Sequence, residues 1–288
     1  MTTKIFILCG TVGTLLGIAL CPSARAAATV YEGFGYTAGT DLGGQNGGTG
    51  FNGAAWIDSA APANKDKVQS GSLAYGSLQT AGNSLLLVTP LTGLGLDRSF
   101  SSISGVDGTT TWISFLLKFD SSVGTLNAGD VGWFSVRPSD FGFSPEFGAF
   151  TNDSNEVVFG IGDYGGNDPV FSTTPFETDT TYLVAGSITW HTGTGQAEDI
   201  SLFLDPAFGP APGSPLVTRN DLDLVNDPGV NLLVKMSILA DGGDSAWLMD
   251  EIRIGASFGD VTPVPEPASV LLALAGGALL WIGCRRRV

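Results

Sequence analysis

Apolar and polar residues alternate along much of the chain between residues 29 and 262. The two-residue period is clearest over 110–119, where one face of a strand would carry Ile113, Phe115, Leu117 and Phe119. Segments with this pattern predict strands at 110–119, 182–190, 200–204, 232–239 and 246–254. Weaker strand signals occur at 30–34, 84–89, 131–137, 157–161 and 170–172.

No long segment of this central region repeats apolar residues at helical spacing, and strands do not alternate with helices. Gly, Ser, Thr, Asn and Asp separate the apolar runs, as in short strands joined by tight turns. The pattern therefore predicts an all-β sandwich. In the last strand, we expect one face to carry Ala246, Leu248, Ile252 and Ile254, and the other to carry Trp247, Met249, Glu251 and Arg253.

The first 28 residues have the layout of a signal peptide. Lys4 precedes the apolar run 5–20, and small residues follow at Ala24, Ala26 and Ala28. These alanines fit the A-x-A rule of signal peptidase, which predicts cleavage after Ala26 or Ala28. Cys21 suggests a lipoprotein as the alternative, but Leu20 stands where lipidation requires a small residue.

The C-terminus predicts a membrane-spanning helix. The apolar stretch 268–284 is slightly shorter than the roughly 20 residues of a usual span. It is followed by Arg285, Arg286 and Arg287, which would stay on the cytoplasmic side and stop the helix.

Val264, Pro265, Glu266 and Pro267 precede this apolar stretch, within a motif at 264–269. Together with the short helix and the terminal arginines, this tail resembles the PEP-CTERM sorting signal of Gram-negative bacteria. The resemblance implies three parts: a signal peptide at 1–28, a β-sandwich domain at 29–260 and a sorting signal at 261–288. It also implies an exported precursor that is held in the inner membrane, processed by an exosortase, and then placed at the cell surface or outside the cell.

The β-sandwich domain at 29–260, called the body from here on, has a second resemblance. Four segments carry it: 31–36 (YEGFGY), 112–119, 202–206 (LFLDP) and 249–255 (MDEIRIG). They are similar to the laminin-G-like, concanavalin A-like domains attached to many PEP-CTERM proteins. This resemblance implies a jelly-roll sandwich of two antiparallel sheets.

The charge and the cysteine content of residues 29–262 narrow the range of possible functions. Eight of the 13 Lys and Arg residues and 27 of the 28 Asp and Glu residues lie between 29 and 262, giving a formal net charge of 8 − 27 = −19 there. Such a surface excludes nucleic acid as a partner and disfavours acidic polysaccharides that no divalent cation bridges. The cysteines, Cys9, Cys21 and Cys284, all lie outside this region, so it has no disulfide and no thiol nucleophile.

The sequence offers few catalytic groups. His191 is the single histidine, and it follows a predicted strand as an exposed turn residue would. Glu177 and Asp179 begin the Glu-x-Asp-x-x-Glu pattern of laminarinase-type hydrolases, but Tyr182 stands where the second glutamate belongs. Asp250 and Glu251 are adjacent and would point to opposite faces of a strand. We therefore predict no catalytic residue and a protein that is not an enzyme.

Calcium is the candidate cofactor, because turns rich in Asp, Asn and Gly supply the oxygen ligands that it prefers. Three loops have this composition: 152–155, 163–168 and 241–244. The first choice is 163–168, with Asp163, Asn167 and Asp168 as ligands. Each loop could equally be an ordinary turn.

Aromatic residues near the predicted loops suggest sugar stacking, with Tyr164 and Trp247 as candidate ligand-binding residues and Trp133 as a further exposed ring. The resulting prediction is a non-enzymatic surface or extracellular-matrix protein associated with exopolysaccharide. A lectin-like carbohydrate-binding module, with or without calcium, is the first alternative. A glycoside hydrolase is the second.

Overall fold

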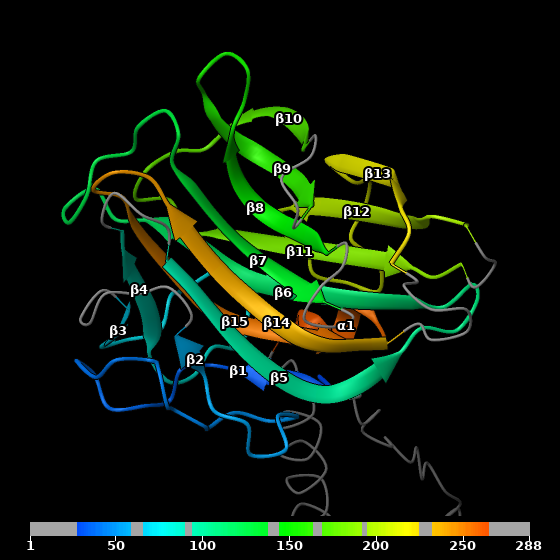
Figure 1. The fold of residues 1–288 in the computed structure, drawn as a ribbon, viewed down its shortest axis with the longest axis horizontal. Coiled ribbons are helices and arrows are strands. Elements are labelled where there is room, and N and C mark those ends of the chain that lie inside the picture. The colour runs from blue at the N-terminus through cyan, green and yellow to red at the C-terminus, as the bar shows by residue number, and fades with distance from the viewer. Residues whose placement is uncertain are drawn as a thin grey trace, which may run out of the picture.

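The computed structural model describes residues 28–58, 66–89, 94–137, 144–163, 169–191, 195–224 and 232–264. These residues form fifteen strands in two antiparallel sheets that lie one behind the other, and one short helix, α1 (Phe258–Val261) (Figure 1). This confirms the prediction of an all-β sandwich. Over the described ranges, no helix is long and apolar enough to cross a membrane.

The first sheet, sheet A, has the order β13-β12-β11-β6-β15-β4-β3, and β1 also pairs with β15. Its strands are β1 (Val30–Glu32), β3 (Asp66–Gln69), β4 (Ser84–Val88), β6 (Thr110–Phe119), β11 (Tyr182–Thr189), β12 (Glu198–Leu204), β13 (Val217–Leu222) and β15 (Ala246–Gly255).

The second sheet, sheet B, has the order β10-β9-β8-β7-β14-β5-β2. Its strands are β2 (Ile57–Asp58), β5 (Leu94–Ser104), β7 (Val131–Arg137), β8 (Pro145–Thr151), β9 (Val157–Asp163), β10 (Val170–Pro175) and β14 (Leu232–Asp241).

All ten predicted strands are present, with bounds that differ by a few residues at most. The sequence pattern missed five strands. Two of them, β2 and β3, are short, and β13 has four consecutive polar residues. The other two, β5 and β8, contain Gly, Ser or Pro among their apolar residues. Both of these lie in sheet B.

The hydrophobic core fills the space between the sheets and includes Trp247, which is fully buried. Its ring packs edge-on against Phe119 and Phe176, at 5.1 Å between centroids in each pair. An aromatic ring enclosed in this way stabilises the sandwich through burial and ring packing. Trp247 therefore does not offer its ring to a sugar, which corrects the expectation that it is exposed.

Strand β15 contains an irregularity that the simple alternation of the sequence does not show. Its pairing with β6 shifts register between Asp250 and Arg253, and Glu251 has a φ of 55°. The extra residue reverses the phase of the strand. Trp247 and Met249 before it, and Ile252 and Ile254 after it, consequently all join the core. The predicted grouping of Leu248 with Ile252 is wrong for this reason.

The glycine-rich segment after β1 is pinned to the end of the sandwich. Arg98 of β5 is fully buried, and its guanidinium donates to Glu32 at 2.5 Å. The same guanidinium lies 3.6 Å from the centre of the Phe51 ring, and the Trp56 indole donates to Glu32 at 3.1 Å. These contacts give the buried charges partners and hold the two bulky side chains of the segment in place.

Candidate functional site

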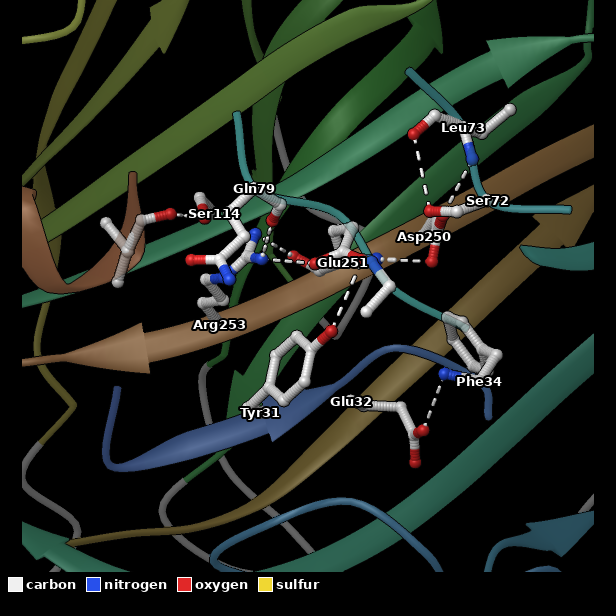
Figure 2. A network of polar contacts seen from close by, with 12 residues as sticks. Tyr31, Glu32, Phe34, Ser72, Leu73, Gln79, Ser114, Asp250, Glu251 and Arg253 are labelled. Atoms are coloured by element: carbon white, nitrogen blue, oxygen red, sulfur yellow. Dashed lines mark hydrogen bonds and ion pairs between the residues drawn. The ribbon is translucent and has the colours of Figure 1, made fainter. Parts of the chain in front are cut away.

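The outer face of sheet A carries a buried carboxyl group, Asp250, beneath the segment that joins β3 to β4. Asp250 accepts hydrogen bonds from the Ser72 hydroxyl at 2.5 Å, the Leu73 amide at 2.8 Å and the Glu251 amide at 2.7 Å. Figure 2 shows these contacts between β15 and the covering segment. Burial raises the pKa of Asp250 to about 8, against the pull of these hydrogen bonds.

Its neighbour Glu251 is equally enclosed. It accepts from the Ala81 amide at 2.5 Å and the Tyr31 hydroxyl at 3.3 Å, and it forms an ion pair with Arg253 (Figure 2). Every oxygen of Asp250 and Glu251 thus has a partner within the protein. A polar group whose hydrogen-bonding capacity is filled in this way ties segments together and has none left for a ligand.

The outer face of sheet B is built differently. The register of its strands sets side chains of five neighbouring strands in one row: Asp97, Ser237, Ser135, Glu146 and Gly162, from β5, β14, β7, β8 and β9 respectively. Because opposed residues of antiparallel strands share a face, this row runs across the sheet, perpendicular to the strands. Five strands at about 4.8 Å spacing make the row about 19 Å long.

One end of the row is an ion-pair network. Arg137 donates to Asp97 and to the Ser237 hydroxyl, and the Ser237 hydroxyl donates to Asp97 at 2.5 Å. The Lys235 ammonium lies 3.4 Å from the same carboxylate. Hydrogen bonding and charge pairing therefore fix this end of the row.

At the centre of the row, polar side chains lack hydrogen-bond partners among the described residues. Glu146 is only 7% exposed, and none of the residues that the structure describes makes a hydrogen bond to its carboxyl group. The Ser135 hydroxyl, opposite it on β7, is fully buried and also has no hydrogen-bond partner. A hydroxyl group that is buried without a partner, such as that of Ser135, costs stability. The Glu146 carboxyl group keeps a small exposed surface, through which a ligand in the adjoining hollow can reach it.

Glu146 lines a depression of about 270 Å³ at the β8–β9 side of the row. The residues around it include a second carboxyl group, two aromatic rings and a glycine. They are Val131, Trp133, Glu146, Phe150, Thr151, Gly162, Asp163 and Pro169. A hollow with apolar walls and a few converging polar groups is the usual form of a small-ligand site.

The electrostatics of the depression favour a protonated Glu146. Burial and the nearby Asp163 together raise the pKa of Glu146 to about 8, while Arg137 and Arg219 act in the opposite direction. Burial also raises the pKa of Asp163, although the Ser144 amide that donates to it at 3.1 Å lowers it. With a pKa near 8, Glu146 keeps its proton at neutral pH, as a general acid must.

Asp163 was predicted as a calcium ligand, and it lies in this depression at the end of β9. The other two proposed ligands, Asn167 and Asp168, and the candidate stacking residue Tyr164 lie outside the described residues. Across the described ranges, no three His, Cys, Asp or Glu side chains gather as a metal site would require. Calcium binding stays a prediction.

The candidate loop at 152–155 is an ordinary turn between β8 and β9, since the Asn152 side chain accepts hydrogen bonds from the Ser154 and Glu156 amides at 2.9 Å. His191 forms an ion pair with Asp199 at 3.0 Å and is partly exposed. This contact raises the pKa of His191, mainly through the hydrogen bond from the ring. Neither residue belongs to the depression.

Glu177 and Asp179, which begin the hydrolase-like pattern, are exposed in the turn before β11. Asp179 has a φ of 61° there, so the two carboxyl groups do not alternate along a strand. Of the sorting and cleavage positions, Ala28 and Val264 bound the described body. Ala26, Pro265, Glu266, Pro267, Arg285, Arg286 and Arg287 lie outside it.

No known family profile and no curated protein matches this chain. Solved structures do share its fold. The alginate lyase Aly36B matches with a TM-score of 0.51 and 14% identity, over 80% of this chain and 98% of its own. A family 16 glycosyl hydrolase from Mycobacterium smegmatis (TM-score 0.49, 13% identity) covers 79% of this chain and 100% of its own. A β-1,3-glucanase from Mycobacterium marinum (0.49, 14%) covers 80% and 99%.

The likeness to the lyase confirms the jelly-roll architecture, and it corrects the prediction of a non-enzymatic protein, since that lyase is a carbohydrate-processing enzyme. At 14% identity, the likeness to the lyase shows the fold alone. A reaction must therefore be inferred from the side chains of this chain.

Proposed function

We propose that this protein is a carbohydrate-active enzyme that cleaves glycosidic bonds of a polysaccharide on the outer face of sheet B. Glu146 is the general acid, and Asp163 is the second carboxyl group of the reaction. The observation that carries the proposal is Glu146 itself, a buried carboxyl group that lines a hollow, has no hydrogen-bond partner among the described residues and has a pKa raised to about 8.

A general acid must hold its proton at the working pH and release it to the leaving group. With a pKa of about 8, Glu146 is mostly protonated at pH 7. It would donate this proton to the glycosidic oxygen as the bond between that oxygen and the anomeric carbon breaks. A water molecule would attack the anomeric carbon and lose its proton to Asp163, so that protons and electrons balance.

A polymer fits the shape of the face better than a single sugar. The polar row extends about 19 Å across five strands, well beyond the depression at Glu146. One related structure was solved with an alginate tetrasaccharide, and oligosaccharide binding by a protein of this fold supports a polysaccharide as the partner.

The test is to incubate the purified body with sodium alginate, a soluble β-1,3-glucan and a mixed-linkage β-glucan, and to measure new reducing ends. Glu146→Gln keeps the shape of the side chain and removes its acidic proton, so we expect cleavage to fall by about 10²–10⁴-fold. Asp163→Asn should also reduce cleavage strongly. Glu177→Gln is the matched control, because Glu177 is exposed in a turn, and it should leave cleavage unchanged.

Cleavage that survives Glu146→Gln would contradict the assignment of the acid, and the absence of cleavage on every polysaccharide would contradict the proposed function. Products with a new carbon–carbon double bond would show that the enzyme breaks the glycosidic bond by elimination and not by hydrolysis. Glu146 would then still protonate the leaving oxygen, and the base would take a proton from the sugar ring.

We also propose that the enzyme acts outside the cytoplasm. The support is in the sequence: the apolar run after Lys4, the alanines before residue 29, and the motif, apolar stretch and arginines at 264–287. Deleting residues 265–288 should release the body in soluble form. A truncated protein that still fractionates with membranes would contradict this.

A further inference from the structure

We infer that Ser135 is a positioning residue for the acid: its buried hydroxyl group donates a hydrogen bond to the carboxylate that Glu146 becomes when it protonates the glycosidic oxygen. Ser135 keeps its own proton, so the balance of the reaction does not change. The inference rests on the proposed function and adds to its site a residue that does not touch the sugar.

Strand pairing places the Ser135 hydroxyl for this role. Ser135 on β7 lies directly opposite Glu146 on β8, and both side chains lie on the outer face of sheet B. The Cβ atoms of two residues opposed in this way are about 4.5–5.5 Å apart. A hydroxyl group on one strand and a carboxyl group on the other can therefore form a hydrogen bond across the strand pair.

The folded protein leaves this donor unused. Ser135 is fully buried, and its hydroxyl group has no hydrogen-bond partner among the described residues. A methyl group at Gly162 would lie 2.6 Å from Oε2 of Glu146, so this oxygen lies over β9, on the far side of β8 from Ser135. The end torsion of a glutamate has broad preferences, so its rotation toward β7 costs little. Hydrogen bonds of catalytic groups often tighten only in the complex with substrate.

The competing acceptor for the Ser135 hydroxyl is Ser237, its neighbour on β14. The Ser237 hydroxyl already accepts from Arg137 and donates to Asp97. A hydrogen bond to an ionised acceptor is roughly twice as strong as one between neutral groups. The Ser135 hydroxyl should therefore turn to Glu146 once Glu146 has lost its proton.

The charged groups that face Glu146 stay in place when Ser135 is changed. Asp163 on β9 raises the pKa of Glu146, while Arg137 on β7 and Arg219 on β13 lower it. These three groups are held by other partners, which are the Ser144 amide, Asp97 and Asp221 respectively. A change in the pKa of Glu146 in a Ser135 variant therefore reports the hydroxyl group and not a rearrangement of charge.

Urea denaturation of the purified protein at pH 7 and at pH 10 tests the hydrogen bond itself. Ser135→Ala should match the wild type at pH 7, where Glu146 holds its proton. At pH 10, the variant lacks a hydrogen bond to a buried carboxylate, so its ratio of folded to unfolded protein should be lower than that of the wild type by about tenfold or more. In a protein that carries Glu146→Gln, the same change should have no effect at either pH.

The pH profile of cleavage tests the role in the reaction, on whichever of sodium alginate and the β-glucans the wild type cleaves. Without its donor, the Glu146 carboxylate is less stable, so Ser135→Ala should move the alkaline limb up by about one pH unit. It should also lower kcat about tenfold and leave KM unchanged, because the acid is weaker and the sugar contacts are intact. Ser135→Thr keeps the hydroxyl group and should keep the wild-type limb.

Ser187→Ala is the matched control, since Ser187 is a buried serine, 6% exposed, on β11 of the other sheet. It should change neither the limb nor the stability difference between pH 7 and pH 10. Equal effects of Ser135→Ala with Glu146 and with Gln at position 146 would contradict the inference, because the hydroxyl group would then act through packing.

Wild-type stability at pH 10 and a wild-type limb in Ser135→Ala, with Glu146→Gln inactive, would overturn the inference and leave the proposed function standing. Cleavage that Glu146→Gln does not affect would overturn the proposed function instead. The denaturation experiment would then still show whether Ser135 and Glu146 are bonded, because it does not depend on activity.

Discussion

The outer faces of the two sheets each bury a carboxyl group whose pKa is raised to about 8, but the two groups differ in their hydrogen bonding. On sheet A, Asp250 accepts three hydrogen bonds, and a segment of the chain covers it. On sheet B, Glu146 lines a hollow and has no hydrogen-bond partner among the described residues. Burial is the main cause of both raised pKa values, so a raised pKa does not distinguish a structural carboxyl group from a functional one.

What distinguishes the two faces is the hydrogen-bonding capacity that the protein leaves unused. Hydrogen bonds to Asp250 and Glu251 hold the covering segment in place. On sheet B, the Ser135 hydroxyl is buried without a partner, and the Glu146 carboxyl group accepts no hydrogen bond from the described residues. Substitutions on sheet A should therefore change stability, and those on sheet B should change activity with little loss of stability.

The largest effect on stability should come from Arg253→Met on sheet A. It removes the ion-pair partner of Glu251 and leaves a buried carboxyl group without its cation, which costs about 3–5 kcal/mol. Urea denaturation of the isolated body measures this. The control Lys118→Met, on the same face but partly exposed, should cost less than about 1 kcal/mol. A similarly small loss of stability in both variants would contradict a structural role for the ion pair between Arg253 and Glu251.

On sheet B, Glu146 should make the stability of the wild-type protein depend on pH. The pKa of Glu146 is raised from 4.5 to about 8 on folding, so the folded state keeps a proton that the unfolded state loses. Stability from this group is fully present below about pH 4.5 and is lost as the pH rises to 8, by about 3–5 kcal/mol. Glu146→Gln should remove this loss. Parallel pH curves for the wild type and this variant, from denaturation at several pH values, would contradict the raised pKa.

A smaller effect is expected for Ser72→Ala, which deletes one of the three donors to Asp250. The loss of one hydrogen bond to a buried group should cost about 1–2 kcal/mol, measured by thermal or urea unfolding. No change would mean that the segment covering sheet A is not held by Asp250.

The smallest effect is expected for Ser135→Ala on sheet B. Its hydroxyl is buried without a partner, so its removal should change the free energy of unfolding at pH 7 by less than about 0.5 kcal/mol, or raise it slightly. A cost as large as that of Ser72→Ala would show that the hydroxyl is bonded in the folded protein, which would remove the contrast between the faces.

Much of the fold could be predicted from the sequence, because alternation reports directly on strands that face a core. The runs at 110–119 and 131–137 coincide with β6 and β7. The phase of β15 could not be predicted, since a bulge at Glu251 depends on partners from distant parts of the chain, Ala81 and Tyr31.

The sequence named Asp163 as a candidate ligand but missed Glu146, because the strand that carries Glu146 was itself missed. Glu146 belongs to β8, in which Pro145 and Gly148 weaken the strand signal, and Asp97 belongs to β5. One local signal existed: Gly160 and Gly162 alternate on β9 and leave one face of it without side chains. The approach of Glu146 to Asp163 depends on strand register, which no local pattern specifies.

The central claim is most directly tested by the pH dependence of polysaccharide cleavage by the purified body, measured as kcat/KM between about pH 3 and pH 10. We predict an alkaline limb with a midpoint near pH 8, from the proton of Glu146, and only residual activity without that limb in Glu146→Gln. Cleavage that falls with a midpoint near pH 4.5, or that is the same in the variant, would contradict the assignment of this face as the active one.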